Sequence, residues 1–165
     1  MIKLRRMTQA EYENYYLNAV QNLADETAKA NGVSPDETLC SAKRCFETLL
    51  PEGNLNVPDQ YLYNILADEQ KVGVLWFGIR RDRVAAVPEA YVWDIVIEAS
   101  SRHQGYGKQT MLALEEEVRT LGISRISLNV FAHNTRAQNL YERLGYSTIS
   151  SLMLKTLEHK SAANN

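Results

Sequence analysis

The segment Arg102–Lys108 contains the residues of this chain that could most directly bind a ligand. It follows a β-branched and aromatic run, Tyr91–Glu98, and precedes an amphipathic stretch that ends near Leu121. Gly105 and Gly107 would let the backbone pass close to a bound group. The following helix would present unpaired N–H groups and the positive end of its dipole to that group. This combination favours a bound phosphate.

Two common phosphate-loop patterns do not fit these residues. A Walker loop would require glycine in place of Arg102 and serine or threonine in place of Gln109. A dinucleotide fingerprint that starts at Gly105 would require a glycine-like residue in place of Thr110. A nucleotide-binding protein is therefore disfavoured. From the loop alone, an ordinary glycine turn that caps a helix is the remaining alternative.

The loop resembles the pyrophosphate loop, [RQ]-x-x-G-x-[GA], of the GCN5-related N-acetyltransferases, known as the GNAT family. About 35 residues later, Asn129–Tyr146 resembles the N-x-x-A…L-Y-x-x-x-G-[FY] signature of the same family. The resemblance is sharpest from Tyr91 to Leu154 and weak before Tyr61. It implies an enzyme that transfers an acetyl group from acetyl-CoA directly to a primary amine, on a small molecule or a protein. A non-catalytic acyl-CoA sensor or scaffold of the same fold is the alternative.

The resemblance also implies how the cofactor is held, with no metal. The backbone of Ile95, Val96 and Ile97 would pair with the pantetheine arm, and a free N–H there would polarise the thioester carbonyl. Asn134 would contact the pantetheine or acetyl end, although its position also suits a helix N-cap. The residues that would bind the pyrophosphate are Arg102, His103, Gln104, Gly105, Tyr106, Gly107 and Lys108.

Tyr141 matches the family tyrosine that protonates the departing thiolate, with a core tyrosine as the alternative. Ribosomal-protein acetyltransferases of the family carry a glutamate base at the position of Asn129, whose amide cannot accept a proton. A lysine-like amine with a pKa near 10.4 must lose a proton, which costs roughly 4–5 kcal/mol at neutral pH. Asp94 and Glu89 are the candidate bases, directly or through water. Either could instead bind a cationic substrate or be solvated. Alternation places Asp94 opposite Trp93 unless a bulge intervenes.

The elements that would position these residues follow from periodicity and turn signals. Thr8 with Glu11, and Ser34 with Pro35 and Glu37, predict two helix starts by the capping-box pattern. The expected strands are residues 1–6, 61–67, 72–79, 91–97, 126–131 and 146–154, and the expected helices start near residues 8, 34, 106 and 134. Residues 80–87 form a polar connection. On the first helix Tyr12, Tyr15 and Tyr16 share a face, where core packing is favoured over a pocket.

This order predicts an α/β (α+β) fold of a single domain, with helices on a mixed, mostly antiparallel sheet. From the resemblance we expect a bulge in strand 91–97, which would splay from strand 126–131 to form the acyl-CoA cleft. The N-acetyltransferase domain would span residues 1–157, and residues 158–165 would be a frayed tail.

Composition restricts the class of protein further. The 165 residues are 45% apolar and 23% charged, with a formal net charge of −2, as in one soluble domain. The weak negative charge argues against nucleic-acid binding, and no apolar run approaches a membrane span. Residues 1–6 lack the apolar stretch of a signal peptide. Cys40 and Cys45 would project from different sides of a helix and neither pair nor chelate. A reducing cytoplasm is therefore expected, and a homodimer is left open.

Overall fold

The computed structural model describes residues 1–81 and 87–157 of the chain. The strands are β1 Ile2–Arg6, β2 Gln60–Ala67, β3 Gln70–Arg80, β4 Glu89–Ile97 and β5 Ile126–Leu128. The α-helices are α1 Gln9–Asn31, α2 Pro35–Leu49, α3 Tyr106–Thr120 and α4 Thr135–Arg143, with short 3₁₀ turns η1 Pro51–Gly53 and η2 Ala99–Ser101. The predicted fold class is confirmed, since the five strands form one sheet in the order β1-β2-β3-β4-β5.

Both predicted helix starts are confirmed by their capping boxes. The Glu11 N–H donates to Thr8 Oγ1 at 3.4 Å, and the Thr8 N–H donates to Glu11 Oε2 at 2.8 Å. Ser34 and Glu37 form the equivalent box before α2, with Pro35 at the first helical position. These bonds satisfy backbone groups that a helix start otherwise leaves unpaired.

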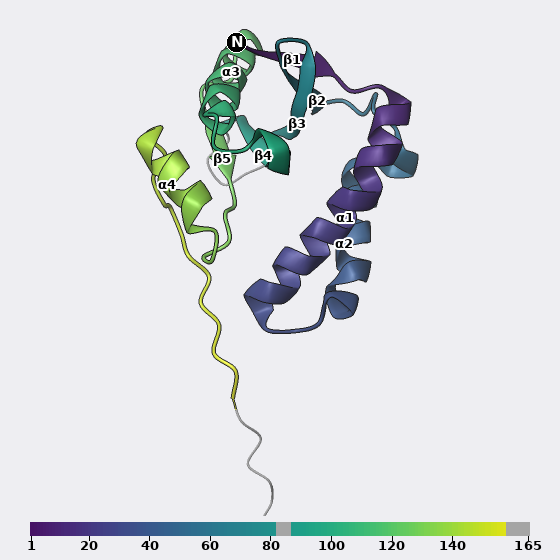
Figure 1. Cartoon of the computed structure of the whole chain (residues 1–165). Coiled ribbons are helices and arrows are strands. Elements are labelled where there is room, and N and C mark those ends of the chain that lie inside the picture. Colours follow the sequence, from purple (N-terminus) through teal and green to yellow (C-terminus); the bar gives the residue numbers. More distant parts are fainter. Residues whose placement is uncertain (82–86, 158–165) are drawn as a thin grey trace, which may run out of the picture.

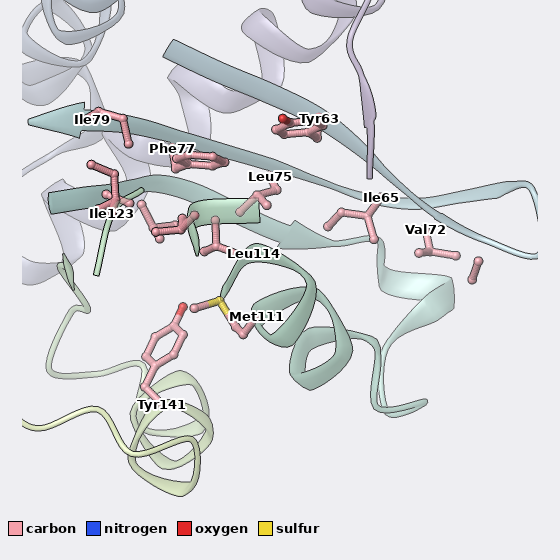
Figure 2. Close-up of a cluster of buried hydrophobic side chains, with 14 residues drawn as sticks. Tyr63, Ile65, Val72, Leu75, Phe77, Ile79, Met111, Leu114, Ile123 and Tyr141 are labelled. Atoms are coloured by element: carbon pink, nitrogen blue, oxygen red, sulfur yellow. The ribbon is translucent and has the colours of Figure 1, made fainter. Parts of the chain in front are cut away.

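The sheet separates two hydrophobic cores, because side chains alternate between its faces. Leu75 and Phe77 of β3 pack against α3 on one face (Figure 2). Val74 and Trp76 of the same strand pack against α1 and α2 on the other face. The molecule therefore has helices on both sides of the sheet, with α3 and α4 on one side and α1 and α2 on the other (Figure 1).

Strand β4 is bulged and separates from β5, as predicted. Trp76 pairs with Asp94 whereas Phe77 pairs with Val92, so Trp93 is the extra residue in β4. β4 and β5 run parallel and pair over only three positions, which end at Val92 and Leu128. Beyond Val92, β4 has no strand partner on this side within the described part of the chain. Its backbone groups there face the gap that the separation opens.

The last strand predicted from the sequence is wrong. Residues 146–154 form no strand; after Tyr146 the chain runs out from the body as an exposed segment (Figure 1). The β-forming residues are present there, but no neighbouring strand lies alongside them. The strand predicted over 126–131 ends earlier, at Leu128. Of the polar connection predicted at 80–87, residues 82–86 lie outside the described residues, as does the predicted frayed tail at 158–165.

Candidate active site

A cleft of about 1120 Å³ occupies the place where β4 and β5 separate. Residues 92–97 of β4 form one wall, and residues 128–131, at and after the end of β5, form the opposite wall. The α3 N-terminus and α4 close one side, while α1 and α2 close the other. Elements that are distant in the sequence thus meet around one space, which is large enough for a cofactor-sized ligand.

The cleft gathers almost all of the residues that the sequence analysis selected. Those that line it are Tyr141, Asp94, Ile95, Val96, Ile97, Arg102, His103, Gly105, Tyr106, Gly107, Lys108 and Asn134. Gln104 is exposed beside it, and its side-chain amide donates to the Ser100 carbonyl at 3.5 Å. Glu89 does not line the cleft.

The glycine loop has the geometry of an anion site. Gly105 caps α3 with a left-handed backbone, φ 79°, which favours glycine. It directs the chain into the first turn of α3, whose N–H groups have no partners within the helix. The Arg102 side chain donates to the Ile97 carbonyl at 3.1 Å and so ties the loop to the end of β4. An anion at this helix start would meet N–H groups and a positive dipole end.

The cationic side of the cleft also includes a residue that the sequence analysis missed. Arg136, in the first turn of α4, lies with its guanidinium 3.3 Å from His103 Nε2 of the glycine loop. Arg102, Lys108 and Arg143 line the same cleft. The motif alone gave no indication of Arg136, because the contact joins residues 33 positions apart. These charges add to the attraction of the helix N-terminus for an anion.

Tyr141 is buried on α4, with 9% of its side chain exposed. Its ring points from α4 toward Met111 of α3 and toward the sheet (Figure 2). Burial, and secondarily the negative charge of Asp94, raises the pKa of Tyr141 to about 12. The hydroxyl therefore keeps its proton at neutral pH. The electrostatic influence of Asp94 also means that these two groups, from α4 and β4, lie within one site.

Asp94 is held by a tyrosine from helix α1. The Tyr15 hydroxyl of α1 donates to Asp94 Oδ2 at 2.7 Å. The bulge at Trp93 allows this, since both Trp93 and Asp94 face the α1 side of the sheet. Burial raises the pKa of Asp94, while the hydrogen bonds from Tyr15 and from the Ile95 backbone lower it in part. The sequence placed Tyr15 in the core, and its burial agrees with that, but it also positions the carboxylate.

A smaller cavity of about 260 Å³ meets the cleft at Asp94. It lies between α1 and the end of β4, and its polar lining includes Asn14, Asn18 and Glu98. Asp94 lines both spaces, so it stands between the main cleft and the surface at α1. A molecule that enters from α1 would reach Asp94 without crossing the glycine loop.

The other two polar candidates occupy different places. Glu89 begins β4, five positions before Asp94, and pairs in register with Arg80. Its side chain is buried, and its Oε1 has no hydrogen-bond partner among the described residues. The structure therefore does not bring Glu89 to the site as a base. Asn129 is exposed and does line the cleft.

A contact that the sequence analysis also missed crosses the cleft opening. His133, in the loop before α4, lies with Nε2 at 2.5 Å from Glu26 Oε2 of α1. The His133 ring stacks on Phe131 at 5.5 Å between centroids. This contact connects the α1 side of the cleft to the β5 side at the rim.

No group of three or more His, Cys, Asp or Glu side chains in residues 1–81 and 87–157 is arranged to hold a metal ion. Among the same residues, no helix combines the length and the apolar character that a membrane crossing needs.

Comparison with known proteins gives a consistent result. Residues 18–146 match the sequence model of the acetyltransferase (GNAT) family. The uncharacterized N-acetyltransferase YycN of Bacillus subtilis strain 168 is 33% identical over 156 residues, which cover 94% of this chain and 99% of YycN. The crystal structure of YycN matches with a TM-score of 0.87 and 32% identity, over 96% of this chain and 100% of that chain.

More distant structures share the fold. A predicted acetyltransferase from Clostridium acetobutylicum, solved with acetyl-CoA, matches with a TM-score of 0.63 at 18% identity, over 98% of this chain and 100% of that chain. AAC(6')-Iy, solved with the bisubstrate analogue CoA-S-monomethyl-acetylneamine, matches with a TM-score of 0.60 at 17% identity, over 96% of this chain and 99% of that chain.

We predict that Tyr15→Phe raises the pKa of Asp94 further. In the wild type the hydrogen bond that Tyr15 donates favours the ionised carboxylate, and the variant removes that bond. Titration of the Asp94 carboxyl by NMR measures this. Tyr16→Phe is the matched control, since Tyr16 lies one residue along α1 and packs its ring against Phe46 instead. An Asp94 titration that is the same in Tyr15→Phe and wild type would contradict the assigned positioning role.

Proposed function

Because the chain belongs to the GNAT acetyltransferase family and is an acetyl-CoA-dependent acyltransferase, we propose that it transfers the acetyl group directly to a primary amine. The observation that carries this proposal is the convergence of three features on one cleft. These are the glycine loop at the α3 N-terminus, the unpaired side of β4, and the side chains of Tyr141 and Asp94. Residues 1–157 would act as one catalytic domain.

Acetyl-CoA would bind mainly through backbone groups. The first-turn N–H groups of α3 and the side chains of Arg102, Lys108 and Arg136 suit the pyrophosphate and other phosphate oxygens. The pantetheine arm would lie along the free side of residues 95–97. Its amide groups would form hydrogen bonds with the β4 backbone there, where β5 does not pair. Asn134 caps α4 by accepting from the Ala137 N–H at 3.2 Å, so its side-chain oxygen is already used in part. The remaining hydrogen-bonding groups of the Asn134 side chain are available to the pantetheine arm.

The reaction would proceed in two steps, attack of the amine on the thioester and then departure of the thiol. The amine nitrogen forms a bond to the thioester carbonyl carbon, and a β4 N–H stabilises the resulting oxyanion. The C–S bond then breaks, and Tyr141 donates its hydroxyl proton to the leaving sulfur. The proton that the amine loses passes to Asp94, directly or through water. No covalent enzyme intermediate is needed.

The position of Asp94 supports its role as the base. It lies where the small cavity on the α1 side meets the cleft, so an incoming amine would meet it first. A raised pKa makes a carboxylate a better proton acceptor than an ordinary aspartate. Tyr15 would fix its orientation. The cavity lining combines carboxamides and carboxylates with Lys71, which suits a polar acceptor.

We predict that Gly105→Glu abolishes acetyl-CoA binding, because it places a negative charge at the anion site on the α3 N-terminus. Isothermal titration calorimetry measures the affinity. Gly105→Asn is the control, since asparagine tolerates the left-handed backbone at Gly105 and adds no charge. It should retain most of the affinity. Undiminished binding by a folded Gly105→Glu protein would exclude this loop as the phosphate site.

For Tyr141→Phe we expect kcat to fall roughly 10²–10⁴-fold, with little change in acetyl-CoA affinity, because only the proton donor is removed. Thiol release from acetyl-CoA measures the rate, with primary amines as acceptors and alcohols of the same carbon skeleton as controls. Native turnover where chemistry is rate-limiting would return Tyr141 to a packing role. Turnover with the alcohols alone would overturn the proposed acceptor.

Activity should be lost as the pH falls through the pKa of Asp94, because the protonated carboxyl cannot accept the amine proton. Since burial raises this pKa above the ordinary 3.8, the loss should begin at a higher pH than for an exposed aspartate. In Asp94→Asn the profile of kcat/KM against pH should no longer show this fall on its acidic side, which we call the acidic limb. Glu89→Gln and Asn129→Ala are controls that should keep it. A limb unchanged in Asp94→Asn would favour deprotonation by solvent.

A further inference from the structure

A row of asparagines lies on the face of α1 that lines the smaller cavity. Asn14, Asn18 and Asn22 are four residues apart, so they share one ridge of the helix. Asparagine is among the less favourable residues in a helix interior, because its side chain competes with the backbone for hydrogen bonds. Three of them on one ridge, all facing a cavity, therefore need a reason other than the stability of the helix.

The row leads from the outer part of the smaller cavity to the main cleft. Asn22 lines both spaces, as does Asp94. Asn14 and Asn18 line the smaller cavity but not the main cleft. A ligand that lies along the row would therefore have one end beside Asp94 and would extend away from the cleft toward Asn14.

The spacing of the row matches the repeat of an extended peptide backbone. Four residues of an α-helix rise about 6 Å. Two residues of an extended chain rise about 6.7 Å, and every second residue presents its backbone N–H and C=O to the same side. A carboxamide offers N–H donors and a carbonyl acceptor, which are the groups that a peptide unit needs as partners. Successive asparagines of the row can thus contact every second residue of one extended chain.

Part of each carboxamide remains for a ligand. Asn14 Nδ2 donates to the Ala10 carbonyl at 3.0 Å, and Asn18 Nδ2 donates to the Asn14 backbone carbonyl at 3.3 Å. Each bond uses one N–H of the side chain, whereas a carboxamide has two N–H groups and an oxygen with two lone pairs. The second N–H and the oxygen are not used by these two bonds, which hold the side chains in place along the helix.

The rest of the lining restricts the kind of molecule that suits the cavity. Lys71 of β3 and Glu98, one residue after β4, line it with opposite charges. A polyamine would place a cation against Lys71, whereas a peptide backbone carries no charge beyond its terminal amine. The volume of about 260 Å³ is below the roughly 300–1,000 Å³ of ordinary ligand pockets, which favours a narrow chain over a bulky ring system.

We propose that the acceptor is the free N-terminal amine of a peptide whose first residues lie extended along Asn22, Asn18 and Asn14. The amine lies beside Asp94, and the backbone behind it bonds to the carboxamides. The amine nitrogen bonds to the acetyl carbon and the C–S bond of acetyl-CoA breaks. The amine proton passes to Asp94, and the leaving sulfur takes a proton from Tyr141. This inference rests on the proposed acetyl transfer and adds the class of acceptor.

The first test is the dependence of kcat/KM on peptide length. Peptide amides of one to six alanine and serine residues serve as acceptors, with propylamine and spermidine for comparison, and thiol release measures the rate. The value should rise up to about four residues, which cover the roughly 12 Å of the row, and then level off. Acetylation of the small amines without a rise with peptide length, or spermidine as the better acceptor, would overturn this inference alone. No acetylation of any amine would overturn the proposed function as well.

The second test locates the backbone contacts. Methylation of one backbone N–H at a time in the six-residue peptide should lower kcat/KM at every second position only. Asn18→Ala should lower kcat/KM for the unmethylated peptide about 3–10-fold, as expected for one hydrogen bond, and should remove the effect of methylation at one position.

Asn31→Ala is the matched control for Asn18→Ala. Asn31 lies on the same helix and donates to the Thr27 carbonyl at 2.8 Å, the same type of bond, but it lines neither cavity. This variant should keep the wild-type values and the same pattern of methylation effects. Methylation effects without the two-residue period, or equal losses in Asn18→Ala and Asn31→Ala, would overturn the proposed peptide contacts.

Discussion

The separation of β4 from β5 after three paired positions is the constraint on which the rest of this structure depends. A strand that loses its neighbour exposes N–H and C=O groups that must find other partners. Here those groups face a cleft that is also lined by a helix N-terminus and by two ionisable side chains. The ligand that such a site favours is long, carries phosphate at one end, and pairs with backbone along its middle. Acetyl-CoA has this form.

The bulge at Trp93 gives the separated strand its chemistry. In a regular strand Asp94 would face the opposite side of the sheet from Trp93; the extra residue turns both toward α1. A carboxylate in that place meets Tyr15 on one side and influences Tyr141 on the other. Burial raises the pKa of Asp94, and the charge of Asp94 helps burial to raise the pKa of Tyr141. The bulge, next to the position where pairing with β5 ends, also places Asp94, which we propose as the base.

The sequence predicted the features that depend on nearby residues. The starts of α1 and α2 follow from Thr8 and Ser34 because a capping box needs only four consecutive positions. The glycine loop was found for the same reason. Tyr15 and Arg136 were missed as site residues, since each acts through a contact 79 or 33 positions away. From the sequence both Glu89 and Asp94 were candidate bases, and the position where pairing with β5 stops separates them.

The failed strand at residues 146–154 has a more general physical reason. Strand preference describes how well side chains suit a pleated surface, and the surface itself must come from a neighbour. Residues of the right type without a neighbour stay solvated, at the cost of exposing leucine, isoleucine and methionine to water. A sequence pattern that predicts a strand therefore states a requirement for a neighbouring strand, and the pattern itself does not show whether one is present.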